Sequence, residues 1–461
     1  MCGVVGIHNH EEAANLAYLG LHALQHRGQE SAGVVSVDQG TMHAVRKMGY
    51  VADVFNETRL ARLPGRIAVG HVRYSTAGGS LPKNVQPLTA ELRDGAVCIA
   101  HNGNLVNAEG LRDELEEQGC IFSSNADTEV ILQLMARSQQ RSLVDKLAAA
   151  LSRVRGAYSL VLSSGNQMVA ARDPHGFRPL VLGRVPGPDV TWVVASETCA
   201  FDLIGAERVR DIEPGEIVQI DEHGIQSTKL PSRGIAPCVF EHVYFARPDS
   251  TLDDVSVYEA RIRMGAALSK EHPVDADVVI PVPDSGVVAA MGYARAAGIP
   301  FEMGLIRNHY VGRTFIEPKD SIRDFGVKLK LNAVPQILAG RRVVVVDDSI
   351  VRGTTSRKIV KMIREAGAAE VHVRISSPPV NNPCFYGIDT PTRAELIASS
   401  HSVEEVARYI TADSVAYLTP KALVDSVKTD GSAFCTACFT GEYPVAVETR
   451  PGRRQLRLIE V

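Results

Sequence analysis

The spacing of apolar residues divides the chain into two halves of different character. In the first half, short apolar runs such as CGVVGI (2–7) and AYSLVLSSG (157–165) alternate with turn residues, which predicts closely spaced strands. Residues 11–25 instead repeat apolar positions at helical spacing, which predicts an amphipathic helix. A half that is rich in strands and flanked by helices predicts stacked sheets covered by helices.

The second half contains longer, uninterrupted apolar runs. ADVVIPVP (276–283) and RRVVVVDD (341–348) are typical of parallel strands with both faces buried. Helices are expected between such strands, and the pattern predicts them over 256–271, 354–366 and 402–410. This half is therefore predicted to be an α/β domain.

The boundary between the halves lies in a segment rich in turn residues. EHGIQSTKLPSRGIAPC (222–238) lacks apolar periodicity, so we expect a connecting segment there. The resulting division gives a first domain over residues 2–230 and a second over residues 231–461.

Composition narrows the class of protein. The 461 residues are 45% hydrophobic and 22% charged with a net charge of -4, which is ordinary for a globular protein and argues against nucleic acid as a partner. The chain does not begin with a basic leader and an apolar segment, and no run of 18 apolar residues occurs. We therefore expect a cytoplasmic protein that binds neither nucleic acid nor membrane.

VVVVDDSIVRGTTS (343–356) joins a buried strand to a helix through an acidic pair and a glycine. Backbone N–H groups of such a loop, together with the helix N-terminus and the hydroxyl groups after Gly353, would bind a phosphate. Asp347 and Asp348 would repel a phosphate, so sugar hydroxyls and Mg²⁺ are their expected ligands. The loop is not a GxxxxGK[ST] motif, which argues against ATP hydrolysis.

This stretch resembles the signature of type I phosphoribosyltransferases, which bind phosphoribosylpyrophosphate (PRPP). The resemblance implies that Asp347 and Asp348 hold the ribose hydroxyls and that the loop after them cradles the 5′-phosphate. The loop residues concerned are Ser349, Arg352, Gly353, Thr354, Thr355 and Ser356. PVPDSG (281–286) looks like the family's pyrophosphate loop, which implies that Ser285, Asp347 and Asp348 lie at the Mg²⁺ position. RNHYVGRTFIEP (307–318) looks like the family's mobile loop, in which Arg307 and Arg313 would meet phosphate charge.

The start of the chain places a thiol at Cys2. If Met1 is removed, Cys2 carries a free α-amino group as well, and the ordinary pKa of such a group, about 7.7–8.0, suits it to take the thiol proton. Attack of the thiolate on a carboxamide produces an oxyanion, which requires hydrogen-bond donors. HNGN (101–104) offers the Asn102 side-chain amide and the Gly103 backbone N–H for this purpose.

A free amino acid also needs a cation for its carboxylate and an anion for its ammonium group. GHVRYSTAG (70–78) supplies Arg73 and SSNADTEV (123–130) supplies Asp127, although each alone would more often be a surface charge. The motifs that point to attack on an amino-acid amide occur along the chain in a fixed order. They are Cys2, HRGQESAG (26–33), GHVRYSTAG, HNGN, DTE (127–129) and DPHGFRPL (173–180).

This series resembles the class II glutamine amidotransferases, which have the αββα fold of N-terminal-nucleophile hydrolases. The resemblance implies that Cys2 attacks the glutamine amide, that Asn102 and Gly103 form the oxyanion hole, and that Arg73 and Asp127 hold the backbone groups of glutamine.

A glutaminase domain followed by a PRPP-binding domain resembles the glutamine phosphoribosylpyrophosphate amidotransferases. The implied reaction releases ammonia from glutamine and uses it to displace pyrophosphate from PRPP, giving 5-phosphoribosylamine in the committed step of purine synthesis. The resemblance also implies a homotetramer inhibited by purine nucleotides. Two alternatives stay open, a glutamine-dependent transferase with another acceptor and a PRPP-sensing regulator without enzymatic activity.

Eight cysteines are present, too few for a disulfide scaffold. Cys98, Cys120 and Cys199 are expected to be buried thiols. The four that remain besides Cys2 are Cys238, Cys384, Cys435 and Cys438. Four thiolates can hold a [4Fe–4S] cluster or a zinc ion, and their spacing does not separate these. One branch of the resembled family carries a [4Fe–4S] cluster at cysteines placed like these four, which implies an iron–sulfur cluster with a structural role.

Overall fold

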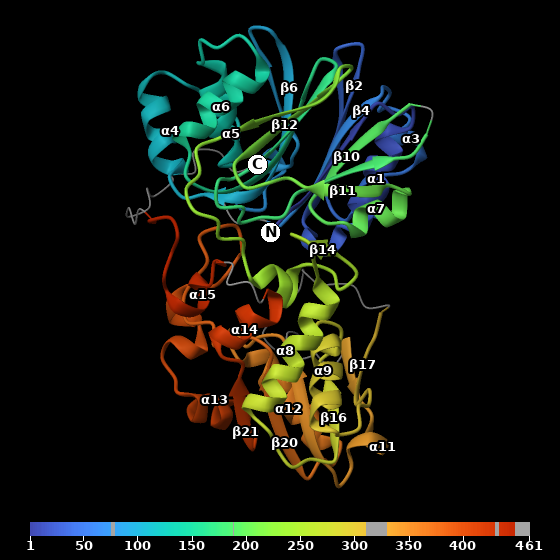
Figure 1. The fold of residues 1–461 in the computed structure, drawn as a ribbon, viewed down its shortest axis with the longest axis vertical. Coiled ribbons are helices and arrows are strands. Elements are labelled where there is room, and N and C mark those ends of the chain that lie inside the picture. The colour runs from blue at the N-terminus through green and yellow to red at the C-terminus, as the bar shows by residue number, and fades with distance from the viewer. Residues whose placement is uncertain (75–78, 188, 310–329, 429–432, 448–461) are drawn as a thin grey trace.

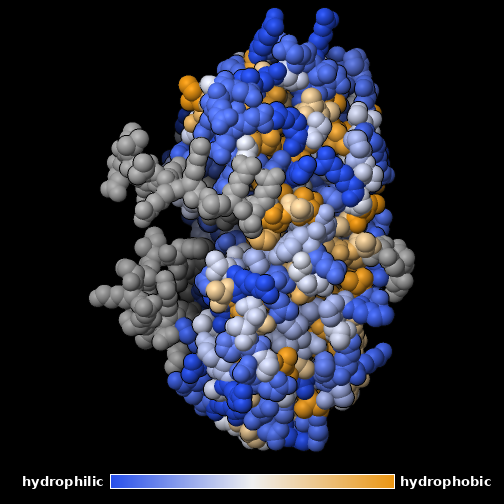
Figure 2. Space-filling view, turned by 90° about the vertical axis from the view of Figure 1, so that its left-hand side faces the viewer, coloured by the Kyte–Doolittle hydropathy of each residue, from blue (hydrophilic) through white to orange (hydrophobic). Residues whose placement is uncertain are grey.

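The protein has two lobes stacked end to end (Figure 1). The structure is a computed structural model that describes residues 1–74, 79–187, 189–309, 330–428 and 433–447. The face drawn in Figure 2 is mainly hydrophilic, and several of its apolar patches lie near the junction of the lobes. Within the described ranges, no helix has both the length and the apolar character needed to cross a bilayer.

The first lobe contains two antiparallel sheets, of which the first has seven strands in the order β11-β9-β10-β1-β4-β2-β3. These strands are β1 (Gly3–His8), β2 (Ser31–Asp38), β3 (Thr41–Met48), β4 (Ile67–Arg73), β9 (Val181–Val185), β10 (Thr191–Ala195) and β11 (Glu207–Asp211). Helices α1 (Ala13–Ala23) and α7 (Cys199–Ile204) pack on its outer face, with the short helices α2 (Val51–Val54) and α3 (Glu57–Leu60) nearby.

The second sheet of this lobe has six strands in the order β13-β12-β8-β7-β6-β5. They are β5 (Leu88–Leu92), β6 (Gly95–Leu105), β7 (Gly156–Ser164), β8 (Gln167–Arg172), β12 (Glu216–Asp221) and β13 (Gly224–Lys229), and helices α4 (Ala108–Glu117), α5 (Thr128–Ala136) and α6 (Leu143–Arg153) cover them. Val4 and Val35 of the first sheet share one buried cluster with Val161 and Ala170 of the second. The predicted αββα arrangement is therefore confirmed.

The second lobe is built on a parallel sheet in the order β16-β19-β20-β21. Its strands are β16 (Val278–Pro281), β19 (Arg342–Asp347), β20 (Glu370–Ile375) and β21 (Ser414–Tyr417), and β17 (Leu305–Arg307) pairs with β18 (Leu331–Ala333) beside it. The helices are α8 (Val257–Glu271), α9 (Val287–Ala297), α11 (Pro335–Leu338), α12 (Thr354–Glu365), α13 (Val403–Ile410), α14 (Pro420–Val427) and α15 (Ala437–Thr440).

Successive valines of β19 point to opposite faces of this sheet, and both faces are covered. Val344 packs in one cluster with α8, α9 and α14, whereas Val343 packs in another with α12 and α13. This arrangement explains the uninterrupted apolar run and confirms the predicted α/β domain.

The connecting segment is shorter than the sequence predicts. Residues 224–229 form β13, which pairs with β12 at the edge of the second sheet, so their interpretation as turn-rich connection is wrong. Most side chains of β13 are exposed, as expected at an edge, and the apolar alternation that marks a strand is therefore missing. Residues 230–237, all of them described, form neither helix nor strand and lead into the short π-helix η3 (Glu241–Phe245).

Candidate active sites

Cys2 lies directly before β1, near the junction of the lobes, where Figure 1 marks the N-terminus. It is 7% exposed, and its thiol donates to the Tyr74 carbonyl with a sulfur–oxygen distance of 3.6 Å. The backbone N–H of Cys2 donates to Asn102 Oδ1 at 3.1 Å, and its carbonyl accepts from Arg27 Nε at 3.0 Å. The backbone of Cys2 is thus held on both sides of the thiol.

Asn102 and Gly103 reach Cys2 from β6 of the opposite sheet. The Nδ2 atom of Asn102 is buried and has no hydrogen-bond partner within the described part of the chain. Gly103 adopts a φ of 154°, and an added Cβ would lie 2.1 Å from the Ala157 carbonyl oxygen, so this position requires glycine. An unpaired donor on the residue that holds the Cys2 N–H is suited to stabilise an oxyanion formed there.

A pocket opens at the thiol and contains four of the predicted residues. It is lined by Cys2, Arg73, Tyr74, Gln86, His101, Gly103, Ala126 and Asp127. Arg73 ends β4, and its Nη1 donates to the Gly79 carbonyl at 2.8 Å. Asp127 precedes α5 and accepts from the Leu105 N–H at 2.9 Å. The pocket therefore presents a guanidinium and a carboxylate beside the thiol.

Two further residues of this pocket, His101 and Gln86, are absent from the predicted set. His101 Nδ1 lies 3.0 Å from Thr128 Oγ1 and 3.6 Å from Asp127 Oδ1. Burial favours the neutral form of each partner, but their mutual attraction outweighs it, which raises the pKa of His101 and lowers the pKa of Asp127. Gln86 Oε1 accepts from the His101 N–H at 2.8 Å. The sequence could have indicated His101, because it is the first residue of the HNGN motif. Gln86 belongs to none of the motifs recognised in the sequence.

The α-amino group of Met1 is buried, with Cys2, Arg178 and Arg27 close by. Burial of the Met1 α-amino group lowers its pKa to about 6, and the neighbouring Arg178 and Arg27 act in the same direction against the opposing effect of Cys2. These surroundings favour a neutral amine, the form that can accept a proton.

In the second lobe, Asp347 and Asp348 lie at the carboxyl end of β19. Burial raises the pKa of both side chains, and the charge of Asp348 raises that of Asp347 further. Ser349 Oγ donates to Asp348 Oδ1 at 2.5 Å, and Ser285 also hydrogen-bonds to the Asp348 side chain. The fold thus brings the predicted residues Ser285, Asp347 and Asp348 together from two separate segments, the loop after β16 and the end of β19.

The loop after Asp348 leads into the N-terminus of α12. Gly353 adopts a φ of 73°, and an added Cβ would lie 2.9 Å from Ile397 Cδ1, so glycine is required at this turn. Thr354 and Thr355 are exposed in the first turn of α12, and Ser356 is half-buried. Hydroxyl groups and backbone N–H groups therefore gather beside the acidic pair.

The predicted arginines lie at the margins of this site. Arg352 is exposed and forms an ion pair with Glu395 at 2.9 Å. Arg307 forms an ion pair with Asp284 of the predicted pyrophosphate loop. Arg313 lies outside the described residues.

The four remaining predicted cysteines converge between the lobes from three segments of the chain. Cys238 and Cys435 form a parallel β-bridge, and Cys384 packs against the buried clusters that contain Cys238, Cys435 and Cys438. Burial and the other three thiols raise the pKa of Cys438 well above its ordinary value. All eight cysteines of the chain are described and are free thiols. Across the described ranges, no group of three or more His, Cys, Asp or Glu side chains is arranged to hold a metal ion.

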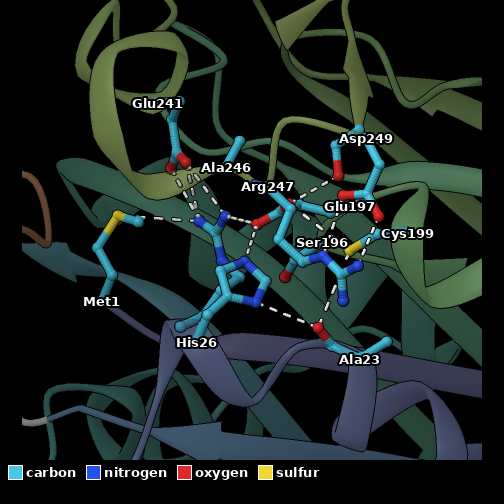
Figure 3. A network of polar contacts seen from close by, with 12 residues as sticks. Met1, Ala23, His26, Ser196, Glu197, Cys199, Glu241, Ala246, Arg247 and Asp249 are labelled. Carbon is cyan, nitrogen blue, oxygen red and sulfur yellow. Dashed lines mark hydrogen bonds and ion pairs between the residues drawn. The ribbon is translucent and has the colours of Figure 1, made fainter. Parts of the chain in front are cut away.

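A buried network of charged side chains joins the lobes beside Cys2, and the sequence did not predict it. Figure 3 shows Glu197, Glu241 and His26 gathered near Met1. Arg27 donates to Glu197 and, at 2.9 Å, to Glu241, which belongs to η3. Burial opposes the charge of Glu197, but His26 and Arg27 outweigh it and lower the pKa of Glu197. The segment that follows the first lobe is thereby bonded to the arginine that holds the Cys2 carbonyl.

Comparisons with known proteins agree with this two-site arrangement. The model of the glutamine amidotransferase domain matches residues 71–202, and the model of the phosphoribosyl transferase domain matches residues 257–376. The amidophosphoribosyltransferase of Bacillus subtilis (strain 168) is 50% identical over 454 residues, which cover 97% of this chain and 94% of the relative. Amidophosphoribosyltransferase 2, chloroplastic, of Arabidopsis thaliana is 55% identical over 446 residues, which cover 96% of this chain and 79% of the relative.

The whole fold is also similar to a solved structure. Glutamine phosphoribosylpyrophosphate amidotransferase from B. subtilis, complexed with ADP and GMP, superposes with a TM-score of 0.91 at 49% identity, covering 97% of this chain and 98% of that one. Both domains, their order and nearly the full length of the chain are shared with these enzymes. The chain therefore belongs to the amidophosphoribosyltransferase family.

Proposed function

We propose that the amidophosphoribosyltransferase reaction of this chain starts at Cys2 and is completed at Asp347 and Asp348. The observation that carries the first step is the buried, unpartnered Nδ2 of Asn102, which belongs to the residue bonded to the Cys2 N–H. The second step rests on three features that lie together at the carboxyl end of the parallel sheet. They are the acidic pair Asp347 and Asp348, the side chain of Ser285, and the N-terminus of α12.

In the first step, Arg73 pairs with the carboxylate of glutamine and Asp127 with its ammonium group. The Cys2 sulfur forms a bond to the amide carbon while its proton moves to the α-amino group that removal of Met1 exposes. The amide oxygen becomes an oxyanion, which accepts hydrogen bonds from Asn102 Nδ2 and the Gly103 N–H. The carbon–nitrogen bond then breaks, the proton moves to the leaving nitrogen, and water later cleaves the thioester to give glutamate.

In the second step, ammonia reaches PRPP inside the protein. Asp347 and Asp348 orient the ribose through its hydroxyl groups, and the backbone of residues 349–356 holds the 5′-phosphate. The nitrogen forms a bond to C1 of the ribose while the bond from C1 to the pyrophosphate oxygen breaks, and loss of one proton from that nitrogen to water gives 5-phosphoribosylamine. Asp347, Asp348 and Ser285 would hold Mg²⁺, which when bound stabilises the charge on the departing pyrophosphate.

We propose further that Cys238, Cys384, Cys435 and Cys438 hold a [4Fe–4S] cluster. The donor set fits this group, because four free thiols converge from three segments, each buried or nearly so. Four thiolates also suit a single zinc ion, and the iron and zinc content of the purified protein separates the two. When bound, the cluster would tie the connecting segment to the end of the second lobe.

Two measurements test these assignments. Pyrophosphate release from PRPP should occur with glutamine or with ammonia, and replacing Cys2 with alanine should abolish only the glutamine-dependent rate. Equal loss of both rates in a folded Cys2→Ala protein would contradict the division of labour between the lobes. Protein purified without oxygen should contain about four irons per chain and absorb broadly near 400 nm. Stoichiometric zinc without iron would refute the cluster.

We also propose that purine nucleotides inhibit the enzyme and that it forms a homotetramer. The support for inhibition is the similarity to the B. subtilis enzyme complexed with ADP and GMP. Initial rates with increasing ADP and GMP, together with light scattering for the molar mass, test both proposals. A rate insensitive to both nucleotides, or a monomeric mass, would contradict the respective proposal.

A further inference from the structure

Arg178 is a fully buried arginine in the loop between β8 and β9. Its carbonyl accepts hydrogen bonds from Arg172 Nε at 2.9 Å and Ser159 Oγ at 3.0 Å, which fix the backbone. Its Nη1 donates to Glu241 Oε1 at 3.0 Å and to Met1 Sδ at 2.6 Å. Its Nε and Nη2 have no hydrogen-bond partner in the residues that the structure describes.

A buried guanidinium N–H that lacks a partner destabilises the folded protein, so such donors usually have partners. Arg172, which is equally buried and lies in the same part of the fold, provides the contrast. Its Nη1 and Nη2 donate to Asp253 at 2.8 and 3.0 Å, and its Nε donates to the Arg178 carbonyl. The two neighbouring buried arginines thus differ. Arg178 has two N–H donors, Nε and Nη2, that are available to a group other than the protein atoms around it.

The four-cysteine site is the group that lies beside Arg178. The Cys238 N–H donates to the carbonyl of Phe177, the residue before Arg178, at 3.2 Å. Phe177 shares a buried cluster with Cys435, and Cys384 packs against that cluster. Burial lowers the pKa of Arg178, but Cys238, Glu241, Cys384 and Cys435 together outweigh burial and raise it.

We propose that Arg178 donates hydrogen bonds from Nε and Nη2 to the sulfur atoms of the iron–sulfur group held by the four cysteines. This inference rests on the proposed cluster. Four thiolates give the loaded site a net negative charge, which a buried guanidinium stabilises. Glu241 orients the guanidinium by holding Nη1, so that Nε and Nη2 stay available. Arg178 is therefore a positioning residue that retains the cluster and sets its reduction potential.

The test uses the full-length protein, loaded and purified without oxygen, and the variants Arg178→Met and Arg178→Lys. Arg374→Lys is the matched control, because Arg374 is a buried arginine of β20 whose donors are paired with His272, Val373 and Ser414, none of which belongs to the cysteine site. Glu241 keeps its bonds to Arg27 in every variant. The readouts are the rate of iron transfer to a chelator and the reduction potential of the cluster.

Arg178→Met should release iron about 10–100-fold faster than the wild type, the usual effect of losing a partner of a metal ligand. Its cluster should have a lower reduction potential, because the more negative reduced state loses a cation and two donors. Arg178→Lys should have a release rate and a potential between those of Arg178→Met and the wild type, and Arg374→Lys should match the wild type. If Arg178→Met is insoluble, faster iron release from Arg178→Lys than from Arg374→Lys supports the same conclusion.

Two outcomes overturn the inference and are distinct. Iron-loaded wild type and Arg178 variants with the same release rate and potential would refute the role of Arg178 while leaving the cluster intact. A wild type without iron would refute the proposed cluster itself, and the role of Arg178 with it.

Discussion

Replacing Asn102 with alanine tests the glutaminase site most directly. The side chain has two functions in the structure, because Oδ1 accepts from the Cys2 N–H at 3.1 Å and Nδ2 is a buried donor without a partner among the described residues. Removing one oxyanion-hole donor lowers kcat by about 10²–10³, equivalent to about 2.7–4 kcal/mol of transition-state stabilisation. Asn102→Ala should therefore lose that factor in glutamine-dependent turnover, and the ammonia-dependent rate should stay unchanged because its chemistry takes place in the second lobe.

The assay is pyrophosphate release at saturating PRPP with glutamine and, separately, with ammonia. Asn102→Asp is the isosteric control, since it keeps an acceptor for the Cys2 N–H but places a negative charge where the oxyanion forms. Its glutamine-dependent kcat should fall at least as far as that of Asn102→Ala. A folded Asn102→Ala protein that loses less than about tenfold in glutamine-dependent kcat would refute the oxyanion role.

Three further predictions concern the chain end, the acidic pair and the buried network. Inserting one alanine between Met1 and Cys2 turns the amine of Cys2 into an amide, which cannot accept the thiol proton. Glutamine-dependent activity should therefore disappear while ammonia-dependent activity remains. Full glutamine-dependent activity, with the insert confirmed by N-terminal sequencing, would contradict the mechanism. Asp347→Asn should abolish PRPP use with either nitrogen donor and leave glutamine hydrolysis detectable, and an unchanged KM for PRPP would exclude the assignment. Glu197→Ala should lower the free energy of unfolding by about 3–5 kcal/mol at neutral pH, because Arg27 then shares Glu241 with Arg178 and the buried network keeps one unmatched positive charge. The pKa of Glu197 is lowered in the folded state from 4.5, so the stability it contributes is present above that value and is lost as the pH falls. Denaturant titrations should therefore show the difference shrinking in acid, and a difference independent of pH would contradict this account.

The sequence predicted those parts of the molecule whose chemistry is contained in short segments. The acidic pair, Gly353 and the hydroxyl residues lie in one strand–loop–helix segment, so their shared location follows from local structure. The apolar run before Asp347 also predicted a strand buried on both faces, since Val343 and Val344 must then contact different helices.

The rest depends on contacts between distant segments. Arg27 is bonded to Glu197 and Glu241, which lie 170 and 214 residues away in sequence, and local periodicity carries no information about such pairs. Gln86 is likewise brought to His101 only by the pairing of strands. The edge strand β13 was missed for a different reason, because an exposed edge does not require the apolar alternation by which strands are recognised.

The placement of Cys384 links the cysteine site to the oxyanion donors. Asn104 Nδ2, on the strand that carries Asn102, donates to the Phe385 carbonyl at 2.9 Å. Gly387 adopts a φ of 102°, and an added Cβ there would lie 2.9 Å from the carbonyl carbon of Gly103. The segment after Cys384 therefore packs directly against the backbone of the oxyanion hole. Because this segment and β6 belong to different lobes, the packing of residues 385–387 against β6 connects the backbone of the oxyanion hole to the second lobe.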